Sequence, residues 1–454
     1  MAVDGVDLDV PPGAIVGLIG ENGAGKTTLA NIAFGALTAD AGTVERSGAV
    51  GLVHQHFELV ERLTVWENVL LGREPRKGWR IDTNVARERV RELGRRHGLE
   101  VDPDAIVETL PVGHKQRVEL LRELEREPAI LLLDEPTAVL APSEIDAFFT
   151  TIVALAKRGT AVLVVTHKLA EVIAYTTSVN VMRGGKIVAR YATTETTTAQ
   201  LAQAMVGGEL PALAEHVPKA AERPNVVEVR GLRAQSGADS IDGIDLDVRS
   251  SEIVAIAGVE GNGQSALADA LAGVAPYEGS IHISGEMQTI PQDRQHEALV
   301  LEWTVTENAI LGRQRRPGFR RGAQIDRGAA RRFTQDIIER FDVRPPRADA
   351  RTRALSGGNQ QKIVVGRALA GEPRFVLAHQ PTRGIDVGAA ALVQSRLIEA
   401  RNAGCAILLI SLELDEIFAL AERVLVLFRG RIVGEFAYPN FDRSRIGELM
   451  AGSA

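Results

Sequence analysis

A long internal repeat constrains the fold of this chain most. Residues 3–10, Val-Asp-Gly-Val-Asp-Leu-Asp-Val, return almost unchanged as Ile-Asp-Gly-Ile-Asp-Leu-Asp-Val at residues 241–248 of 454. A second pair, at residues 64–73 and 304–313, shares Thr-Val-x-Glu-Asn and Leu-Gly-Arg at nearly the same spacing. The period is far longer than the roughly 20–50 residues of a solenoid repeat, so it indicates a duplicated domain.

The boundaries of the two copies follow from composition. The segment between them is rich in Pro and small residues, which is typical of a linker. We predict a first domain at residues 1–206, a linker at 207–224 and a second domain at 225–454. Apolar runs at 14–19, 129–133 and 161–165 are continuous, as in strands covered on both faces. The pattern predicts an α/β fold with helices on both sides of a sheet.

Charge and cysteine content exclude several classes of protein. A net charge of −7 and a pI near 5.8 argue against nucleic acid as the main partner. The lone Cys405 lies in an apolar run, so we expect a core residue and no internal disulfide. No apolar stretch approaches the roughly 20 residues that span a bilayer. The first residues show no basic region followed by an apolar one, as a secretory signal would. We therefore expect a soluble chain in the cytosol.

A phosphate-binding loop follows the first apolar run. Residues 20–28 read Gly-Glu-Asn-Gly-Ala-Gly-Lys-Thr-Thr, a full match to Gly-x-x-x-x-Gly-Lys-Ser/Thr between a predicted strand and a predicted helix. Backbone N–H groups of such a loop surround phosphate oxygens at a helix N-terminus. We expect Lys26 to reach the β and γ phosphates of ATP and Thr27 to bind Mg²⁺. The other expected contacts come from Gly20, Asn22, Gly23, Gly25 and Thr28.

Two carboxylates end a second apolar run. Asp134 and Glu135 follow residues 130–133, at the strand edge where open α/β sheets bind ligands. Asp134 is the candidate Mg²⁺ partner and Glu135 the candidate base for an attacking water. Taken alone, Asp-Glu-Pro fits a surface turn equally well. His167 ends a third run, and a lone histidine there is more often structural than catalytic.

Together these motifs resemble a tandem ATP-binding-cassette protein. Walker A lies at 20–27, Walker B at 131–135 and a switch histidine at His167, while Leu-Ser-Gly-Gly-Asn-Gln-Gln at 355–361 resembles the family signature. The resemblance covers nearly the whole chain and implies two P-loop NTPase domains, each a RecA-like core with an inserted helical subdomain. It also implies Q-loop glutamines at Gln55 and Gln292, with Gln55 as a further Mg²⁺ ligand and catalytic residue.

In this family two cassettes face each other head to tail, so each ATP lies between the Walker motifs of one half and the signature of the other. This pairing within one chain, or a homodimer, would build the sites. Site one would combine the first-half residues with second-half residues of the expected chemistry, namely Ser356, Gly357, Gly358, Gln360 and the D-loop residue Asp386.

Site two has lost most of its chemistry. Its loop at 258–265 has Gln264 in place of lysine, and its Walker B carries His379 and Gln380 in place of the two carboxylates. Leu412 aligns with His167, and the first-half signature and D-loop lack their serine and aspartate at Pro111 and Ala141. We still expect this site to bind a nucleotide, through the N–H groups of Gly258, Gly261 and Gly263 and through Ser265. We do not expect it to hydrolyse the nucleotide at a useful rate.

The second-half loop at 258–264, the first-half signature at 110–113 and residues 380–386 resemble those of ATPase subunits of carbohydrate-type importers. The nucleoside branch is the most similar, and ribose- or galactose-type importers are the alternative. The resemblance implies two integral-membrane permease subunits, a substrate-binding lipoprotein acting indirectly, and a peripheral position on the cytoplasmic face of the membrane. A tandem cassette factor acting on ribosomes is the alternative from another class. The family resemblance implies that such ribosomal factors have two intact sites and a long charged linker. This chain differs, because its linker is short and contains Pro and its second site is degenerate.

Two surface features leave alternatives open. Arginines cluster around residues 73–80 and 312–321, which fits solvated helices first, anionic lipid headgroups second and nucleic acid third. His54 and His56 flank Gln55 and are interpreted as loop residues rather than metal ligands.

The start of the chain departs from the repeat. Residues 225–240 precede the second copy and should form an opening strand, whereas the first copy begins at Val3 with no counterpart. In the family that stretch carries an aromatic residue that stacks on adenine. Either the native chain begins upstream of Met1, or ATP binds here without that platform.

Overall fold

The computed structural model describes residues 2–21, 23–54, 57–137, 140, 142–207 and 223–452. The chain divides into two compact units, Met1–Leu210 and Pro211–Ala454, and each is described by itself. Most of the predicted linker lies outside the described residues. Among the described residues, no helix is both long and apolar enough to cross a bilayer.

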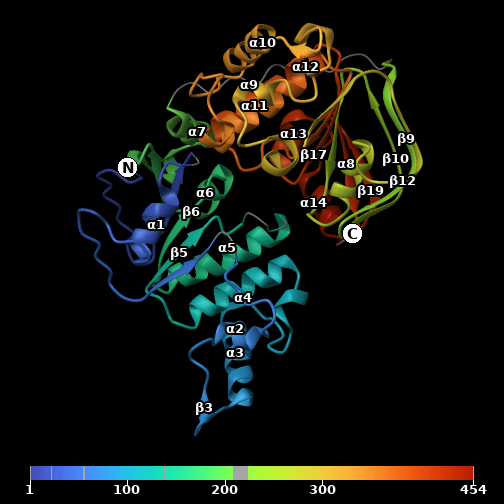
Figure 1. The fold of residues 1–454 in the computed structure, drawn as a ribbon. Coiled ribbons are helices and arrows are strands. Elements are labelled where there is room, and N and C mark those ends of the chain that lie inside the picture. Colours follow the sequence, from blue (N-terminus) through green and yellow to red (C-terminus); the bar gives the residue numbers. More distant parts are fainter. Residues whose placement is uncertain are drawn as a thin grey trace. The chain divides into compact units, whose positions relative to one another are not determined.

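A six-stranded sheet forms the centre of the first unit, in the order β2-β5-β6-β1-β7-β8. Every neighbouring pair is parallel except β7 and β8, which are antiparallel. The strands are β1 (Ile15–Gly20), β2 (Val50–Val53), β5 (Ile130–Asp134), β6 (Ala161–Val165), β7 (Ser178–Arg183) and β8 (Lys186–Ala192). The helices around this sheet are α1 (Lys26–Phe34), α5 (Pro142–Lys157), α6 (Leu169–Tyr175) and α7 (Thr198–Val206), with a short turn η2 (Thr193–Glu195) (Figure 1).

Both faces of this sheet are covered, as its continuous apolar runs predicted. Along β6, Val162 and Val164 pack in one apolar cluster, while Leu163 and Val165 pack in another. Alternate side chains of a strand point to opposite faces, so the two clusters lie on opposite sides of the sheet. The prediction of an α/β fold is confirmed.

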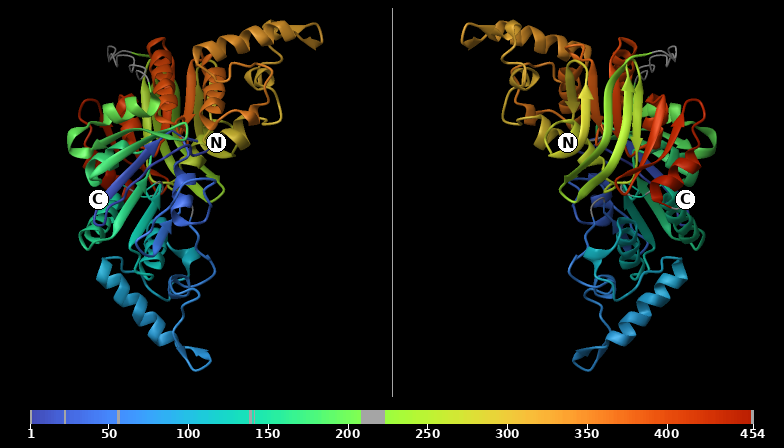
Figure 2. Two further views of the ribbon diagram at one scale, coloured as in Figure 1. Left: turned by 90° about the vertical axis from the view of Figure 1, so that its left-hand side faces the viewer. Right: turned by 90° about the vertical axis from the view of Figure 1, so that its right-hand side faces the viewer.

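A helical subdomain is inserted between β2 and β5. It contains α2 (Val65–Val69), the hairpin β3 (Arg76–Lys77) and β4 (Arg80–Ile81), α3 (Thr83–His97), η1 (Val107–Thr109) and α4 (Val112–Leu124). Helix α2 begins with a capping box in which the side chain of Thr64 and that of Glu67 each bond the other's backbone. The hairpin carries Arg76 and Arg80 of the first arginine cluster. It lies at the N-terminal end of α3 (Figure 2).

The second unit repeats this plan. Its six-stranded sheet has the order β13-β16-β17-β11-β18-β19. The strands are β11 (Ile253–Ala257), β13 (Met287–Ile290), β16 (Phe375–His379), β17 (Ala406–Ser411), β18 (Arg423–Phe428) and β19 (Arg431–Ala437). The helices of this core are α8 (Gln264–Leu271), α12 (Val387–Asn402), α13 (Leu414–Leu420) and α14 (Arg443–Ala451). Cys405 is buried beside β17, and burial raises the pKa of its thiol to about 12, as expected of a core residue.

The second helical subdomain follows the same order as the first. It contains α9 (Val305–Ala309), η4 (Pro317–Phe319), the hairpin β14 (Arg320–Arg321) and β15 (Gln324–Ile325), α10 (Arg327–Arg340), η5 (Thr352–Ala354) and α11 (Gly357–Leu369). A single turn of π-helix, η3 (Arg294–Ala298), precedes it.

The second unit has an additional antiparallel sheet. Its strands are β9 (Asn225–Ser236), β10 (Asp239–Arg249) and β12 (Tyr277–Ile283), in the order β10-β9-β12, and they lie at one side of the unit (Figure 1). The predicted opening strand is therefore confirmed as β9. The repeat copy at 241–248 lies in β10, whereas the copy at 3–10 forms no regular strand. A strand needs a neighbour for its backbone groups, and the described part of the first unit has no counterpart of β9.

Candidate functional site

The phosphate loop of the first unit joins β1 to α1. Gly25 precedes the helix with a φ of 100°, and Gly23 has a φ of 84°, conformations that strain other residues. Lys26 is buried, and its Nζ donates to the carbonyl oxygens of Gly20 (2.8 Å) and Glu21 (3.1 Å). Burial lowers the pKa of Lys26, opposed by the nearby carboxylates. A cation held this way can turn toward a phosphate, so the loop fits a nucleotide.

Asp134 and Glu135 lie at the carboxyl end of β5 beside this loop. Asp134 is buried, and burial raises its pKa, although a hydrogen bond from the Thr27 hydroxyl opposes the shift. Carboxylate and hydroxyl oxygens are the ligands that Mg²⁺ prefers, usually with phosphate oxygens completing the shell. Asp134 and Thr27 therefore fit a Mg²⁺ ion bound with a nucleotide.

Glu135 and His167 form a pair above the sheet edge. Nδ1 of His167 lies 3.0 Å from Oε1 of Glu135, within hydrogen-bond distance. Burial by itself would raise the pKa of Glu135, but the bond from His167 and the charges of His167 and Lys26 hold it below the ordinary value. An ionised, oriented carboxylate is what a general base requires. Glu135 also has a φ of 47°, a strained conformation that is common at active sites.

A threonine and a glutamate behind this pair were not identified from sequence. Thr137 is buried, and its hydroxyl lies 2.8 and 2.7 Å from the two carboxylate oxygens of Glu171 on α6. This contact joins the turn after Glu135 to the helix after His167. The repeat itself could have revealed the pair, because the second half has Thr382 and Glu416 at the same positions. There Thr382 donates to Oε1 of Glu416 (2.8 Å).

The N–H groups of the corresponding loop in the second unit are bonded by Gln264 of the loop itself and by Asp239 of a neighbouring strand. Nε2 of Gln264 donates to the carbonyl oxygen of Val259 (2.9 Å), and its Oε1 accepts from the N–H of Asn262 (3.1 Å). The N–H of Ser265, which in a phosphate loop faces the nucleotide, donates to Oδ2 of Asp239 (3.2 Å). Asp239 lies on the neighbouring hairpin, and its position was not predicted.

The strand end of the second unit keeps the backbone of the first but not its chemistry. Gln380 has a φ of 49°, and its N–H donates to Ile410 (2.7 Å), as the N–H of Glu135 does to Val165 (2.8 Å). His379 is buried, and burial lowers its pKa to about 4, so the ring is neutral near pH 7. A neutral imidazole and an amide stand where the first unit has two carboxylates.

The signature residues gather at the start of α11. Ser356 is exposed, and its hydroxyl caps the helix by accepting from the backbone N–H of Asn359 (3.5 Å). The same oxygen accepts from Nδ2 of Asn359 (2.8 Å). A Cβ atom on Gly358 would lie 3.0 Å from Oδ2 of Asp386, which caps α12 by accepting from the N–H of Ala389 (2.7 Å). The second unit thus brings its signature and its D-loop aspartate together.

Other predicted residues are less exposed or not described. Gln360 is buried, and its Nε2 bonds the carbonyls of Thr352 and Leu355 (3.2 Å each), away from the exposed Ser356. Gly261 is exposed, whereas Gly258 is buried against the side chain of Gln264 and the backbone of Leu427. Gly263 is buried against residues 240–241 and 430. Asn22, Gln55, His56 and Ala141 lie outside the described residues, while His54 pairs with Glu58 (3.5 Å).

Comparisons with known proteins agree with this geometry. The ABC transporter family matches residues 3–138 and again 241–383. The nucleoside import ATP-binding protein NupA of Lactococcus lactis is 38% identical over all of this chain and 95% of its own length. The guanosine import ATP-binding protein NupO of Bacillus subtilis is also 38% identical, over all of this chain and 95% of its own. The ribose import ATP-binding protein RbsA 3 of Rubrobacter xylanophilus is 36% identical over all of this chain and 96% of its own.

A solved structure shows the same tandem fold. The archaeal ribosome recycling factor aABCE1, in complex with the stalk protein aP1, superposes with a TM-score of 0.69 over 95% of this chain and 87% of its own. At 20% identity this likeness concerns the fold alone. The matches to the family and to the three relatives cover both repeats. The chain therefore belongs to the ABC transporter family, as an ATPase with two cassettes in tandem.

Proposed function

We propose that this chain is the ATP-hydrolysing subunit of an importer for nucleosides, with one hydrolytic site and one degenerate site. The observation that carries the proposal of unequal sites is the Glu135–His167 pair, whose aligned positions in the second half hold Gln380 and Leu412. Relatives named for nucleoside and guanosine import support nucleosides as the substrate. Ribose- or galactose-type sugars are the alternative, supported by a relative named for ribose import.

The hydrolytic site uses the first-unit residues in separate roles. The P-loop N–H groups and Lys26 bind the phosphates, and Asp134 with Thr27 holds Mg²⁺, which neutralises phosphate charge when bound. Glu135 accepts a proton from the attacking water, and His167 orients that carboxylate through its bond to Oε1. Ser356, Gly358 and Asp386 of the second half complete this site, as the family pairing implies.

The degenerate site lacks each of these functions. The amide of Gln380 cannot take a proton from water at neutral pH, and removing a general base costs about 10²–10⁴ in rate. Neutral His379 supplies no charge for Mg²⁺. A nucleotide must also break two hydrogen bonds, the one from the N–H of Ser265 to Asp239 and the one from the N–H of Asn262 to Gln264. We therefore propose weak nucleotide binding there and no useful hydrolysis.

The proposed importer needs membrane partners. Two integral-membrane permease subunits, contacted through the Q-loop regions around Gln55 and Gln292, place the chain on the cytoplasmic face of the membrane. An extracytoplasmic binding protein delivers the substrate and acts on this chain only indirectly.

Purification from the native membranes tests the proposal. The tagged chain should retain two integral-membrane proteins, and proteoliposomes of that complex with the binding protein should take up labelled guanosine or uridine when supplied with ATP. The same complex with Glu135→Gln is the matched control, and it should show no ATP-driven uptake. Uptake of ribose but not nucleosides would select the sugar alternative, and retention of ribosomes instead of membrane proteins would select the soluble factor.

A further inference from the structure

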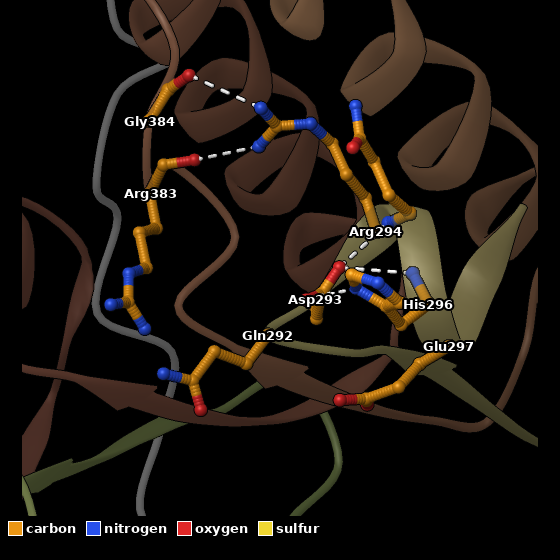
Figure 3. Close-up of a pocket in the computed structure, with 8 residues that line it drawn as sticks. Gln292, Asp293, Arg294, His296, Glu297, Arg383 and Gly384 are labelled. Carbon is orange, nitrogen blue, oxygen red and sulfur yellow. Dashed lines mark hydrogen bonds and ion pairs between the residues drawn. The ribbon is translucent and has the colours of Figure 1, made fainter. Parts of the chain in front are cut away.

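The segment after the second Q-loop glutamine has an unusual backbone. Residues Arg294–Ala298 form a single turn of π-helix, and the carboxylate of Asp293 caps it by accepting from the N–H groups of Gln295 (2.9 Å) and His296 (3.0 Å). Single π-helical turns are rare and are frequent at functional sites. The turn lines a pocket of about 520 Å³ that also includes Arg383 and Gly384 (Figure 3).

Arg294 crosses this pocket and holds the turn before the D-loop aspartate. Its Nη1 donates to the carbonyl oxygen of Arg383 (3.0 Å) and its Nη2 to that of Gly384 (3.4 Å) (Figure 3). Both carbonyls lie just ahead of Asp386, which caps α12. The planar guanidinium presents two donors in a fixed fork, so it fixes both carbonyls relative to one another.

The same guanidinium packs against the signature. A Cβ atom on Gly357 would lie 2.6 Å from Nη2 of Arg294, so only glycine fits there while the arginine keeps its place. The next residue, Gln295, donates from Nε2 to Oε1 of Gln360 on α11 (3.0 Å). The π-helical turn therefore contacts both the signature helix and the turn before Asp386.

We propose that Arg294 is a positioning residue for ATP hydrolysis. It holds the second-half signature and Asp386 in the mutual arrangement that the hydrolytic site requires, and it ties that arrangement to the Q-loop of the degenerate half. The inference rests on the proposed function, because it assumes that Ser356, Gly358 and Asp386 serve the site containing Glu135. The second half, which has lost its own catalytic carboxylates, then still contributes Arg294 to the positioning of the hydrolytic site.

The first unit anchors the matching segment differently. Arg122 on α4 donates to the carbonyl oxygen of Glu58 and pairs with Glu119 (2.9 Å). That arginine comes from the signature helix itself rather than from the Q-loop segment. Phe57 stands at the position of the first unit that aligns with Arg294, so no arginine occupies that place beside the degenerate signature at residues 110–114.

Steady-state kinetics of the full chain test the role of Arg294. Arg294→Ala should lower kcat by at least about 10-fold with little change in the KM for ATP, because the phosphate loop of the first unit is untouched. Arg294→Lys should not restore kcat, since an ammonium cannot fix both carbonyls. Arg383→Ala is the matched control: it removes a neighbouring side chain of the same pocket but keeps the backbone carbonyl, and kcat should stay near wild type.

A double-mutant cycle separates positioning from general destabilisation. Gly357→Ala should push the guanidinium away and reproduce the loss in kcat, and adding it to Arg294→Ala should cost little more, because the new methyl group then has room. Additive losses, an unchanged kcat in Arg294→Ala, or full rescue by Arg294→Lys would overturn the inference. If Arg294→Ala fails to fold, Arg294→Lys, which keeps the aliphatic stem of the side chain, takes its place, and an unchanged kcat in that variant overturns the inference.

The kcat of Glu135→Gln, measured in the same ATPase assay, tests the proposed function separately from the role of Arg294. If Glu135→Gln is inactive while Arg294→Ala is fully active, only the positioning role is wrong. If Glu135→Gln remains active, the asymmetric function itself is wrong.

Discussion

Nδ1 of His167 lies 3.0 Å from Oε1 of Glu135, although the two residues come from different strand ends of the first unit. Parallel neighbours β5 and β6 bring their carboxyl ends to one edge, and this places the histidine against the carboxylate. The second unit builds the same edge with Gln380 and Leu412.

Glu135→Gln should abolish essentially all ATPase activity, by at least about 100-fold, because no other base remains. Phosphate release at saturating ATP measures the effect, and nucleotide binding should persist. Gln380→Ala, a change at the equivalent strained position, should leave the rate near wild type. A Glu135→Gln enzyme with about half the wild-type rate would show that the second site hydrolyses ATP.

The second loop should gain a nucleotide when its internal contacts are replaced. Combining Asp239→Ala with Gln264→Lys frees the N–H of Ser265 and supplies a cation. Titration with a fluorescent ATP analogue should then show a second site, at least about 10-fold tighter than in wild type. Asp242→Ala, which removes an exposed carboxylate from the same strand, is the control. An unchanged second-site affinity in the double variant would contradict the blocking role of Asp239.

The pH dependence of hydrolysis should follow the Glu135–His167 pair. Glu135 acts as a base only when ionised, and His167 holds its pKa below the ordinary value against the effect of burial. Removing the ring in His167→Ala should therefore raise the pKa and move the acid limb of the kcat profile to higher pH. His97→Ala, in the helical subdomain, should change neither the limb nor the plateau. A limb that stays in place in His167→Ala would show that the histidine does not tune this carboxylate.

The buried Glu416 should make the second unit less stable as pH rises. It is fully buried, and burial raises its pKa to about 7, despite hydrogen bonds from Ser411 (2.6 Å) and Thr382 (2.8 Å). The folded state holds a proton that the unfolded chain releases near pH 4.3, so stability falls between about pH 4.3 and 7 and is lowest above that.

Glu416→Gln removes this titration while keeping the shape of the side chain. The variant should gain about 1–3 kcal/mol in the free energy of unfolding at pH 8, and it should lose most of the slope between pH 5 and 7. Denaturant unfolding at several pH values measures both. Glu448→Gln, a change of an exposed carboxylate on α14, should keep the wild-type slope. A Glu416→Gln profile parallel to wild type would mean that the carboxyl is already ionised in the fold.

The fold could be predicted from the sequence because its signals are local. Continuous apolar runs predicted covered strands, and the repeat predicted two similar units. Gly25, Lys26 and Thr27 are neighbours in sequence, so the motif alone was enough to place their loop between a strand and a helix. The almost identical residues 3–10 and 241–248 differ in structure, because only the second copy lies in a strand. A strand depends on a partner, and β9 is that partner for residues 241–248.

The sequence by itself therefore determined the duplication, the family and the unequal chemistry of the two strand ends, since each depends on which residue stands at a motif position. Only the tertiary structure decided that Asp239 bonds the N–H of Ser265, that Glu171 reaches Thr137, and that Arg294 joins a Q-loop to a signature. Each of those contacts links residues from different elements. Their distances depend on how strands and turns pack, which motif spacing does not encode.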